Sequence, residues 1–215
     1  IFSSTAAVYG EKKLQKLVKE NHSLNPINPY GKSKLIAESI IIDTCKKHGI
    51  KNAILRYFNV AGADPKGRTG QIKKPSTHLI SVACETAIGL REKIEIFGSD
   101  YNTKDGTCIR DFIHVSDLVD IHLVAYKYLK VSNKSLILNC GYSKGYSVLE
   151  VVEATKRISK SNYKVNFVNR RKGDPSFLVA DNSKLKSVLK WKPKYNKLDK
   201  IVLDTINWER KLQEK

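Results

Sequence analysis

Two kinds of hydrophobic pattern alternate along this chain. Short continuous apolar runs, which are typical of strands buried on both faces of a sheet, occupy 1–7, 53–58, 93–97, 136–139 and 165–168. Longer stretches with apolar residues three or four apart, which are typical of amphipathic helices, occupy 30–47, 78–90, 115–129, 182–189 and 198–211. Strand, helix and strand in succession predict a parallel sheet, so the expected fold class is α/β.

The longest helical pattern has a well-marked start. Asn28 is a suitable helix cap, and Pro29 suits the first helical position because its missing N–H would have no partner there. We expect this helix to reach Lys47 and to contact the core through Leu35, Ile36, Ile40 and Ile41.

Tyr30 and Lys34 lie four residues apart on this helix and therefore share one face. A nearby ammonium favours the charged phenolate, lowers the tyrosine pKa and prepares it to take a proton from an alcohol. The spacing alone is common in a chain with 31 Lys and 10 Tyr, and Tyr126 and Lys130 repeat it. The context of a capped helix between two strands is what favours Tyr30 and Lys34 as candidate catalytic residues.

Polar residues follow the two strands that flank this helix. Thr5 lies at the end of the first apolar run, and Asn59 follows the second. In open α/β sheets, ligands bind at the carboxyl ends of the strands. We therefore expect Thr5, Tyr30, Lys34 and Asn59 to converge on one crevice.

Composition excludes several other classes of protein. The net charge of +18 comes from 31 Lys and only 8 Arg, scattered along helix faces, which does not favour nucleic-acid recognition. The apolar runs are too short to span a bilayer, and no secretory leader is present. The four Cys form no Cys-x-x-Cys pair and indicate neither a zinc site nor a redox dithiol, so we expect a cytoplasmic protein without a metal.

The start of the chain suggests an incomplete sequence. The chain contains no Met, and its first apolar run begins in mid-strand. A Gly-x-Gly-x-x-Gly motif after a strand, the usual dinucleotide fingerprint, is also absent from the sequence. We therefore expect a fragment that carries only the later strands of a Rossmann-type parallel sheet, with a smaller mixed α/β lobe for the substrate.

Arginines and one aspartate form a second group of candidates. Arg110 lies in an alternating segment over 107–114, and Arg170, Arg171 and Asp174 share a basic turn. Two arginine positions with planar guanidinium groups suit the clamping of a pyrophosphate. An ordinary Arg–Asp surface pair is an equally acceptable reading of the same residues.

Six segments together resemble the UDP-glucose 4-epimerase family, a group of extended short-chain dehydrogenases/reductases. They are SSTAAVYG at 3–10, YGKSK at 30–34, LRYFN at 55–59, DGTCIRDFIHV at 105–115, NCG at 139–141 and RRKGD at 170–174. The resemblance covers essentially the whole chain and implies NAD as cofactor, a UDP-hexose as substrate, no nucleic-acid or membrane partner, and a homodimer. It also implies that 1–60 and 114–160 are the remainder of the NAD-binding domain, and that 61–113 and 161–215 bind the nucleotide sugar.

The resemblance implies a role for each candidate. Tyr30 would take the proton of the hexose 4-hydroxyl, Lys34 would lower the pKa of Tyr30 and hold the nicotinamide ribose, and Thr5 would hydrogen-bond the sugar. Phe58 would lie along the cofactor. The implied substrate contacts are Asn59, His78, Leu79, Arg110, Arg171, Asp174 and Leu178, with Glu95, Ile96 and Phe97 around the uracil.

The chain departs from the family at a few positions, and related activities stay open. His78 stands where many relatives carry Asn, Phe112 where Tyr is common, and bulky Leu178 where space for an N-acetyl group is set. Dehydratases of the same superfamily place Asp-Glu after the Ser/Thr, whereas Ala6-Ala7 follow Thr5 here. The alternatives are a nucleotide-sugar dehydratase, a decarboxylase, a UDP-N-acetylglucosamine 4-epimerase, or a fragment that is inactive by itself.

Overall fold

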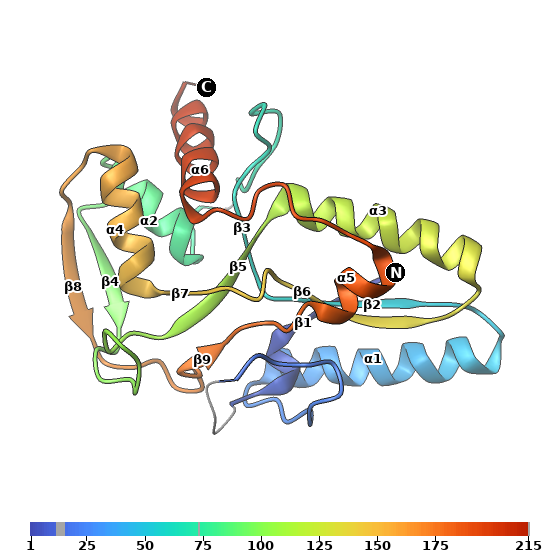
Figure 1. The fold of residues 1–215 in the computed structure, drawn as a ribbon. Helices are drawn as coiled ribbons and strands as arrows, with labels where there is room; N and C mark the ends of the chain where they lie inside the picture. The colour runs from blue at the N-terminus through green and yellow to red at the C-terminus, as the bar shows by residue number, and fades with distance from the viewer. Residues whose placement is uncertain (12–15, 73, 215) are drawn as a thin grey trace.

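The computed structural model describes residues 1–11, 16–72 and 74–214, which form an α/β fold (Figure 1). The strands are β1 (Phe2–Thr5), β2 (Ala53–Tyr57), β3 (Asn59–Ala61), β4 (Lys93–Phe97), β5 (Ile109–His114), β6 (Leu136–Cys140), β7 (Gly145–Ser147), β8 (Lys164–Val168) and β9 (Phe177–Leu178). The helices are the 3₁₀ helix η1 (Ala6–Tyr9), α1 (Pro29–Lys47), α2 (Leu79–Ala87), α3 (Val115–Ser132), α4 (Val148–Ser159), α5 (Ser183–Leu189) and α6 (Leu198–Gln213).

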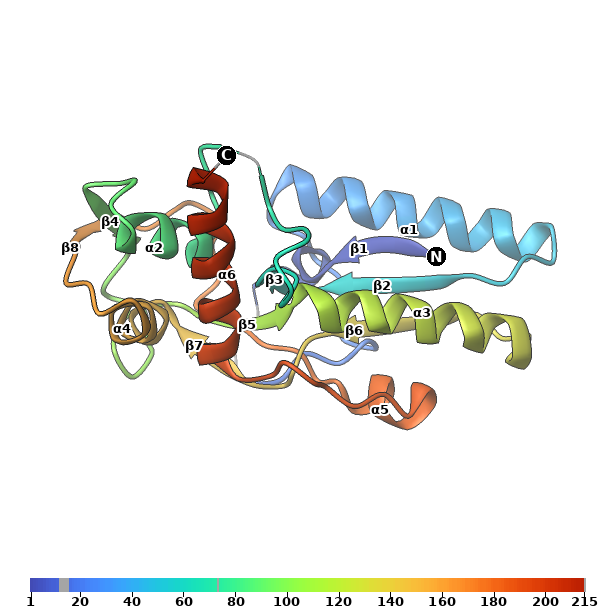
Figure 2. The same cartoon turned by 90° about the horizontal axis from the view of Figure 1, so that it is seen from above.

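A three-stranded parallel sheet in the order β1-β2-β6 forms the first part of the molecule. Helices α1 and α3 lie on opposite faces of this sheet (Figures 1 and 2). On the α3 face, Leu55 and Leu138 are fully buried in one cluster with Leu118 and Ile121 of the helix. The expected βαβ unit is confirmed, since β1 and β2 are adjacent and parallel with α1 between them in the chain.

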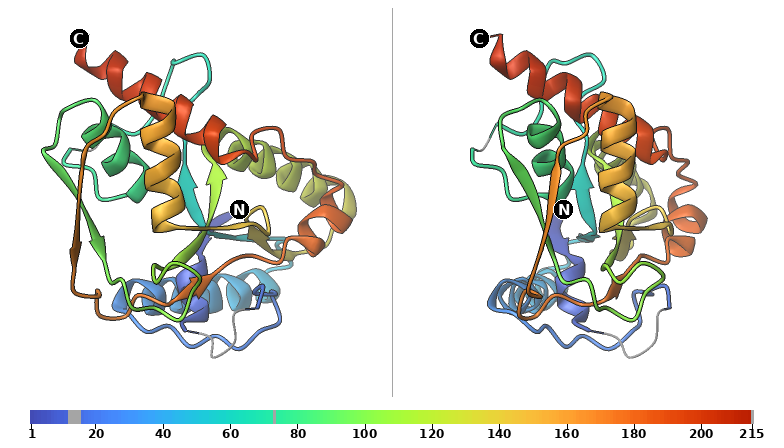
Figure 3. Two further views of the ribbon diagram at one scale, coloured as in Figure 1. Left: turned by 60° about the vertical axis from the view of Figure 1, so that its left-hand side comes forward. Right: turned by 90° about the vertical axis from the view of Figure 1, so that its left-hand side faces the viewer.

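The second part of the molecule is built around β5. Strand β5 pairs with β3 and β9 in parallel and with β7 antiparallel, while β4 and β8 form a separate parallel pair. Helices α2, α4 and α6 pack against one another beside these strands (Figure 3). A capping box starts α4, with the Ser147 hydroxyl and the Glu150 carboxylate each accepting the other residue's backbone N–H.

Helix α1 begins as predicted, because the Asn28 side chain accepts the N–H of Gly31 at 2.8 Å and Pro29 is the first helical residue. Of its four predicted core contacts, one is confirmed and two are wrong, while Ile41 is half-buried and belongs to no core cluster. Leu35 packs against a buried cluster, but Ile36 and Ile40 are 52% and 61% exposed. The two buried residues of α1 are Gly31 and Glu38, so the side of the helix that meets the sheet is set by these positions, and Ile36 and Ile40 lie outside it.

Other local features differ from what the sequence patterns predict. The first strand ends at Thr5 and continues as η1 rather than as strand to residue 7. The connection 98–106 links two sheets, because β4 and β5 belong to different ones. Strands β3 and β7 have three residues each, too few to show a hydrophobic period, and were not predicted. No helix formed by the described residues has the length and apolar character of a membrane span.

Candidate functional site

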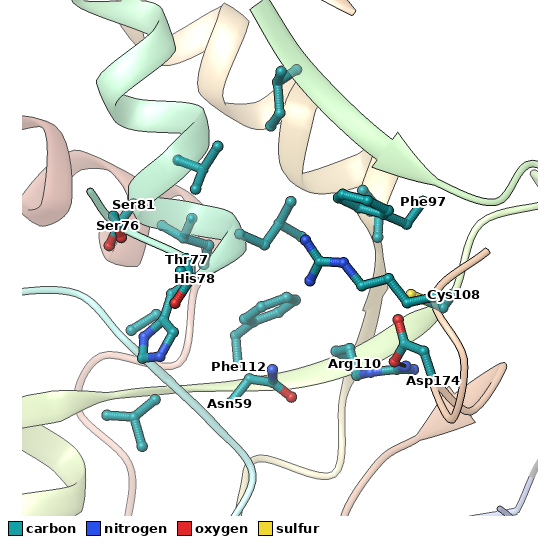
Figure 4. A pocket seen from close by; sticks show the side chains of 18 of the residues that line it. Asn59, Ser76, Thr77, His78, Ser81, Phe97, Cys108, Arg110, Phe112 and Asp174 are labelled. Atoms are coloured by element: carbon teal, nitrogen blue, oxygen red, sulfur yellow. Dashed lines mark hydrogen bonds and ion pairs between the residues drawn. The ribbon is translucent and has the colours of Figure 1, made fainter. Parts of the chain in front are cut away.

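A groove with a volume of about 920 Å³ opens where the two parts of the molecule meet. Its lining includes eleven of the predicted site residues: Thr5, Tyr30, Phe58, Asn59, His78, Leu79, Glu95, Phe97, Arg110, Arg171 and Asp174. Figure 4 shows part of this groove, with Phe112 and Asn59 below and to the left of Phe97, and Arg110 beside Asp174 at the right. This size falls within the usual range for small-molecule sites.

One end of the groove carries the candidate catalytic residues, and we call it the catalytic end. Tyr30 is 57% exposed at the start of α1, and Thr5 ends β1 with its hydroxyl accepting the Ala7 N–H at 3.2 Å. The Lys34 ammonium donates to the Ser3 carbonyl at 3.1 Å and lies 6.0 Å from the Tyr30 ring centre. An ammonium has three protons, so two remain for a ligand.

A buried ion pair lies beneath the catalytic end and was missed in the sequence. The Glu38 carboxylate of α1 accepts two hydrogen bonds from Arg56 of β2, at 2.7 and 3.0 Å, and a third from the Ser4 hydroxyl. Both charged side chains are 2% exposed. Burial opposes the charge of Arg56, but its hydrogen bonds to Glu38 and Tyr9 outweigh burial and raise its pKa.

Tyr9 and Asn139 extend this pair into a network. The Tyr9 hydroxyl accepts from Arg56 at 2.9 Å and donates to the Asn139 side chain at 2.7 Å, and burial raises the Tyr9 pKa to about 12. The signal for this network was a charged residue, Arg56, inside an apolar strand, since a buried charge requires a partner. The network fixes α1, and with it Tyr30 and Lys34, against β1 and β2.

Tyr57 is a groove residue that the sequence analysis did not single out. Its hydroxyl lies 2.6 Å from that of Ser3 and hydrogen-bonds Nε2 of His122 on α3. Nδ1 of His122 donates to the Leu118 carbonyl at 2.8 Å, so Nε2 is the acceptor in neutral histidine. The contact joins α3 to the strand ends on the face opposite α1.

The other end of the groove, which we call the nucleotide end, carries the arginines. Arg110 is paired with Asp174 and also donates to the Pro175 carbonyl at 2.5 Å. The Arg171 guanidinium lies 3.6 Å from the Phe97 ring centre, a cation–π contact. Arg110 and Asp174 therefore form the Arg–Asp pair of one predicted reading, although Arg110 is buried. Both residues line the groove together with Arg171, and the pyrophosphate clamp stays a prediction.

Three predicted site residues lie outside the lining of this groove. The Lys34 ammonium is held at the Ser3 carbonyl, 6.0 Å from the Tyr30 ring centre. The Ile96 side chain is 1% exposed and packs in a core cluster with Ile94 and Val152, so any ligand contact would come from its backbone. Leu178 lines a smaller cavity of about 210 Å³ next to the groove, which also touches Thr5, Phe58 and Asn59.

The buried carboxylate of Asp111 in β5 holds two segments of the chain, the one that follows β6 and the one that follows β9. Asp111 accepts backbone N–H groups from Tyr142 at 2.8 Å, Ser143 at 3.0 Å and Ala180 at 3.2 Å. Burial raises the Asp111 pKa to about 7, and the three N–H donors act in the opposite direction. Because Ala180 follows β9, this contact fixes the segment that carries Leu178.

The arrangement combines a tyrosine and a lysine on one helix, parallel strand ends beside them, and a groove lined by Arg110 and Arg171. These features define the class of extended short-chain dehydrogenases/reductases. Residues 1–205 match the family model described as GDP-mannose 4,6 dehydratase, and the chain belongs to this family.

Relatives give a more specific similarity. UDP-glucose 4-epimerase from Azospirillum brasilense is 50% identical over 214 residues, all of this chain and 61% of the relative. Among solved structures, the UDP-Glc/GlcNAc 4-epimerase of Campylobacter jejuni is 49% identical with a TM-score of 0.79, over 98% of this chain and 64% of that one. UDP-glucose 4-epimerase from Bifidobacterium longum in complex with NAD⁺ and UDP is 34% identical with a TM-score of 0.91, over 98% and 63%. The chain thus spans about three fifths of the length of these relatives.

Proposed function

We propose that the complete gene product is an NAD-dependent UDP-glucose 4-epimerase, which interconverts UDP-glucose and UDP-galactose. The observation that carries the proposal is one groove lined by Tyr30, with the Lys34 ammonium 6.0 Å from its ring centre, and by Arg110, Arg171 and Asp174. That distribution suits a sugar with a hydroxyl to deprotonate and a diphosphate to hold. Relatives of the same name at up to 50% identity support it.

The proposal assigns a role to each of five groove and neighbouring residues. Tyr30 accepts the proton of the sugar 4-hydroxyl and returns it, and Lys34 favours its phenolate form. Thr5 orients the sugar oxygen, and Arg171 contacts the diphosphate. Bound NAD supplies the hydride acceptor and donor at the sugar C4. The two free protons of Lys34 and the buried wall of Phe58 fit the nicotinamide ribose and ring, so these residues would hold that end of the cofactor.

The proposal is tested with the complete gene product, UDP-glucose or UDP-galactose, and NAD. Formation of the second sugar from the first, followed by NMR of the anomeric proton, is the expected result. Absence of turnover from either side would reject the function. We expect the 215-residue chain by itself to be inactive, because the glycine motif that holds NAD phosphates in the family is absent from it.

A second candidate substrate class is UDP-N-acetylhexosamines. It is favoured by the Campylobacter relative, whose name includes the N-acetylated sugar. Leu178 argues against it, because this bulky buried residue stands in the small cavity beside Thr5 and Asn59. We infer a preference for plain hexoses, and equal turnover of UDP-N-acetylglucosamine would contradict that preference. The dehydratase reading has less support, since Ala6-Ala7 provide no acid or base after Thr5.

We also propose that α1 forms a homodimer interface in the complete gene product. Ile36 and Ile40, one turn apart on the same face of this helix, are 52% and 61% exposed, although their side chains are apolar. Apolar side chains that gather on one helix are typical of an interface between proteins. Sedimentation of the complete gene product as a monomer at micromolar concentration would contradict this proposal.

A further inference from the structure

We propose that Arg170 is a positioning residue for nucleotide binding, because it fastens the arginine loop, residues 169–175, to the connection between β4 and β5. The loop carries Arg171 and Asp174 of the groove, whereas Arg170 itself is outside the groove lining. This inference rests on the proposed binding of UDP at the nucleotide end.

Arg170 makes three contacts with two consecutive residues of the β4–β5 connection. Its Nε donates to the Asp100 carboxylate at 2.6 Å, and a terminal nitrogen donates to the Asp100 carbonyl. Its guanidinium also lies 4.2 Å from the ring centre of Tyr101, which is 6% exposed. Exposed ion pairs alone contribute little, but stacking on a buried ring gives this one a fixed geometry.

Gly98 permits the close approach of the two segments. Its N–H donates to the Val168 carbonyl at 2.8 Å, which extends the β4–β8 pairing to the start of the arginine loop. Its φ of +89° is in the left-handed region, and an added Cβ would lie 2.6 Å from the Tyr101 ring and 2.7 Å from Cγ of Arg170. A side chain at position 98 would therefore push the loop and the connection apart.

Two successive arginines thus contact two aromatic rings on either side of Gly98. Arg170 stacks on Tyr101 outside the groove, and Arg171 stacks on Phe97 inside it. Between β8 and β9 the chain has no regular structure in the described residues, so side-chain contacts set the position of the loop. Loss of the Arg170 contacts to Asp100 and Tyr101 should displace Arg171 and Asp174. It should not disturb β4, where the uracil base is expected to bind.

The test is calorimetric titration of the complete gene product with UDP and with uridine. We expect Arg170→Ala to raise the dissociation constant of UDP about fivefold and that of uridine less than twofold, because uridine has no phosphate for Arg171. Gly98→Ala, which acts from the other segment, should give the same pattern. Arg157→Ala is the matched control, since it removes another exposed Arg–Asp pair, 2.8 Å from Asp199, and should leave both constants unchanged.

The outcomes separate the two proposals. Wild-type protein that fails to bind UDP would reject the proposed nucleotide site, and this inference with it. Wild-type binding with an unchanged UDP constant in Arg170→Ala would overturn the positioning role alone. Equal losses of UDP and uridine binding together with a lower melting temperature would also overturn it, because they would show a general role in folding. In the epimerase assay, we expect Arg170→Ala to raise KM for UDP-glucose and to leave kcat within twofold.

Discussion

The two ends of the groove are supported in different ways. At the catalytic end, Tyr30 is exposed and Lys34 is half-buried, and the helix that carries them is tied to the sheet by the buried Glu38–Arg56 pair. At the nucleotide end, Arg110 is buried, whereas its partner Asp174 belongs to a surface loop that is held by side-chain contacts. The comparison indicates that the candidate catalytic residues are supported by a buried ion pair, whereas Arg171 and Asp174 are held by side-chain contacts of a surface loop.

The largest expected effect follows from breaking the support of the catalytic end. Arg56→Met leaves the Glu38 carboxylate buried without its cation, and removing one partner of a buried pair costs about 3–5 kcal/mol. Urea unfolding of the variant measures this loss in free energy of unfolding. The double variant Glu38→Met/Arg56→Met removes the stranded charge and should recover part of the loss, and a double variant that is less stable than the single one would contradict this explanation.

The second effect concerns chemistry at the same end. Tyr30→Phe removes the proton acceptor and should lower kcat of the complete gene product about 10²-fold or more, with an unchanged melting temperature because the hydroxyl is exposed. Tyr126→Phe is a matched control from α3. Tyr126 has the same spacing to Lys130, with 52% exposure against 57% and a ring-to-ammonium distance of 5.6 Å against 6.0 Å. Equal activity of both variants would remove Tyr30 from the mechanism.

Features set by neighbouring residues, such as the start of a helix, could be predicted from the sequence. Ion pairs between residues far apart in the chain could not. Asn28 and Pro29 specify the start of α1 through neighbours within three residues, and this prediction is confirmed. Ile36 and Ile40 were placed in the core because apolar spacing shows which residues share a face but not which face meets the sheet. That face is set by Glu38 of α1, whose partner Arg56 lies on strand β2, 18 residues further along the chain.

The site was predicted as a set of residues rather than as an arrangement. The motifs indicated Arg110, Arg171 and Asp174 together, yet no sequence pattern states that Asp174 pairs with Arg110, 64 residues away. The position of Leu178 in a separate small cavity depends on the pairing of β9 with β5, and a two-residue strand has no hydrophobic period of its own. The roles assigned to these residues stay predictions until they are measured.

A smaller effect is expected when the nucleotide end loses a phosphate contact. Arg171→Ala should weaken UDP binding about tenfold, because a hydrogen bond to a charged group contributes about 1.5 kcal/mol or more. Arg171→Lys should recover only part of the affinity, since lysine keeps the charge and loses the planar fork. Lys172→Ala removes the neighbouring exposed cation and should have little effect. Titration calorimetry distinguishes these variants, and equal losses at both positions would indicate a nonspecific charge effect.

The smallest effect concerns a buried histidine at the end of β5, the strand that begins near Arg110. His114 is fully buried, with Nδ1 accepting the Ser116 N–H at 3.0 Å and Nε2 donating to Asp204 of α6 at 3.1 Å. Burial lowers its pKa from 6.5, although Asp204 opposes that shift. Below pH 6.5 the histidine therefore binds a proton in the unfolded chain but stays neutral in the folded one. The free energy of unfolding falls as the pH decreases from that value.

This titration can be separated from general acid unfolding. The contribution of His114 is at most about 1.4 kcal/mol for each pH unit below 6.5. His114→Asn keeps a side chain able to cap α3 but removes the titrating group, so its stability should fall less steeply between pH 6.5 and 5 than that of the wild type. His48→Asn, at an exposed histidine after α1, should keep the wild-type slope. Urea unfolding at successive pH values gives these slopes. Identical slopes in the wild type and in His114→Asn would mean that the acid sensitivity comes from other groups, and that α6 is held to β5 without help from the charge state of this histidine.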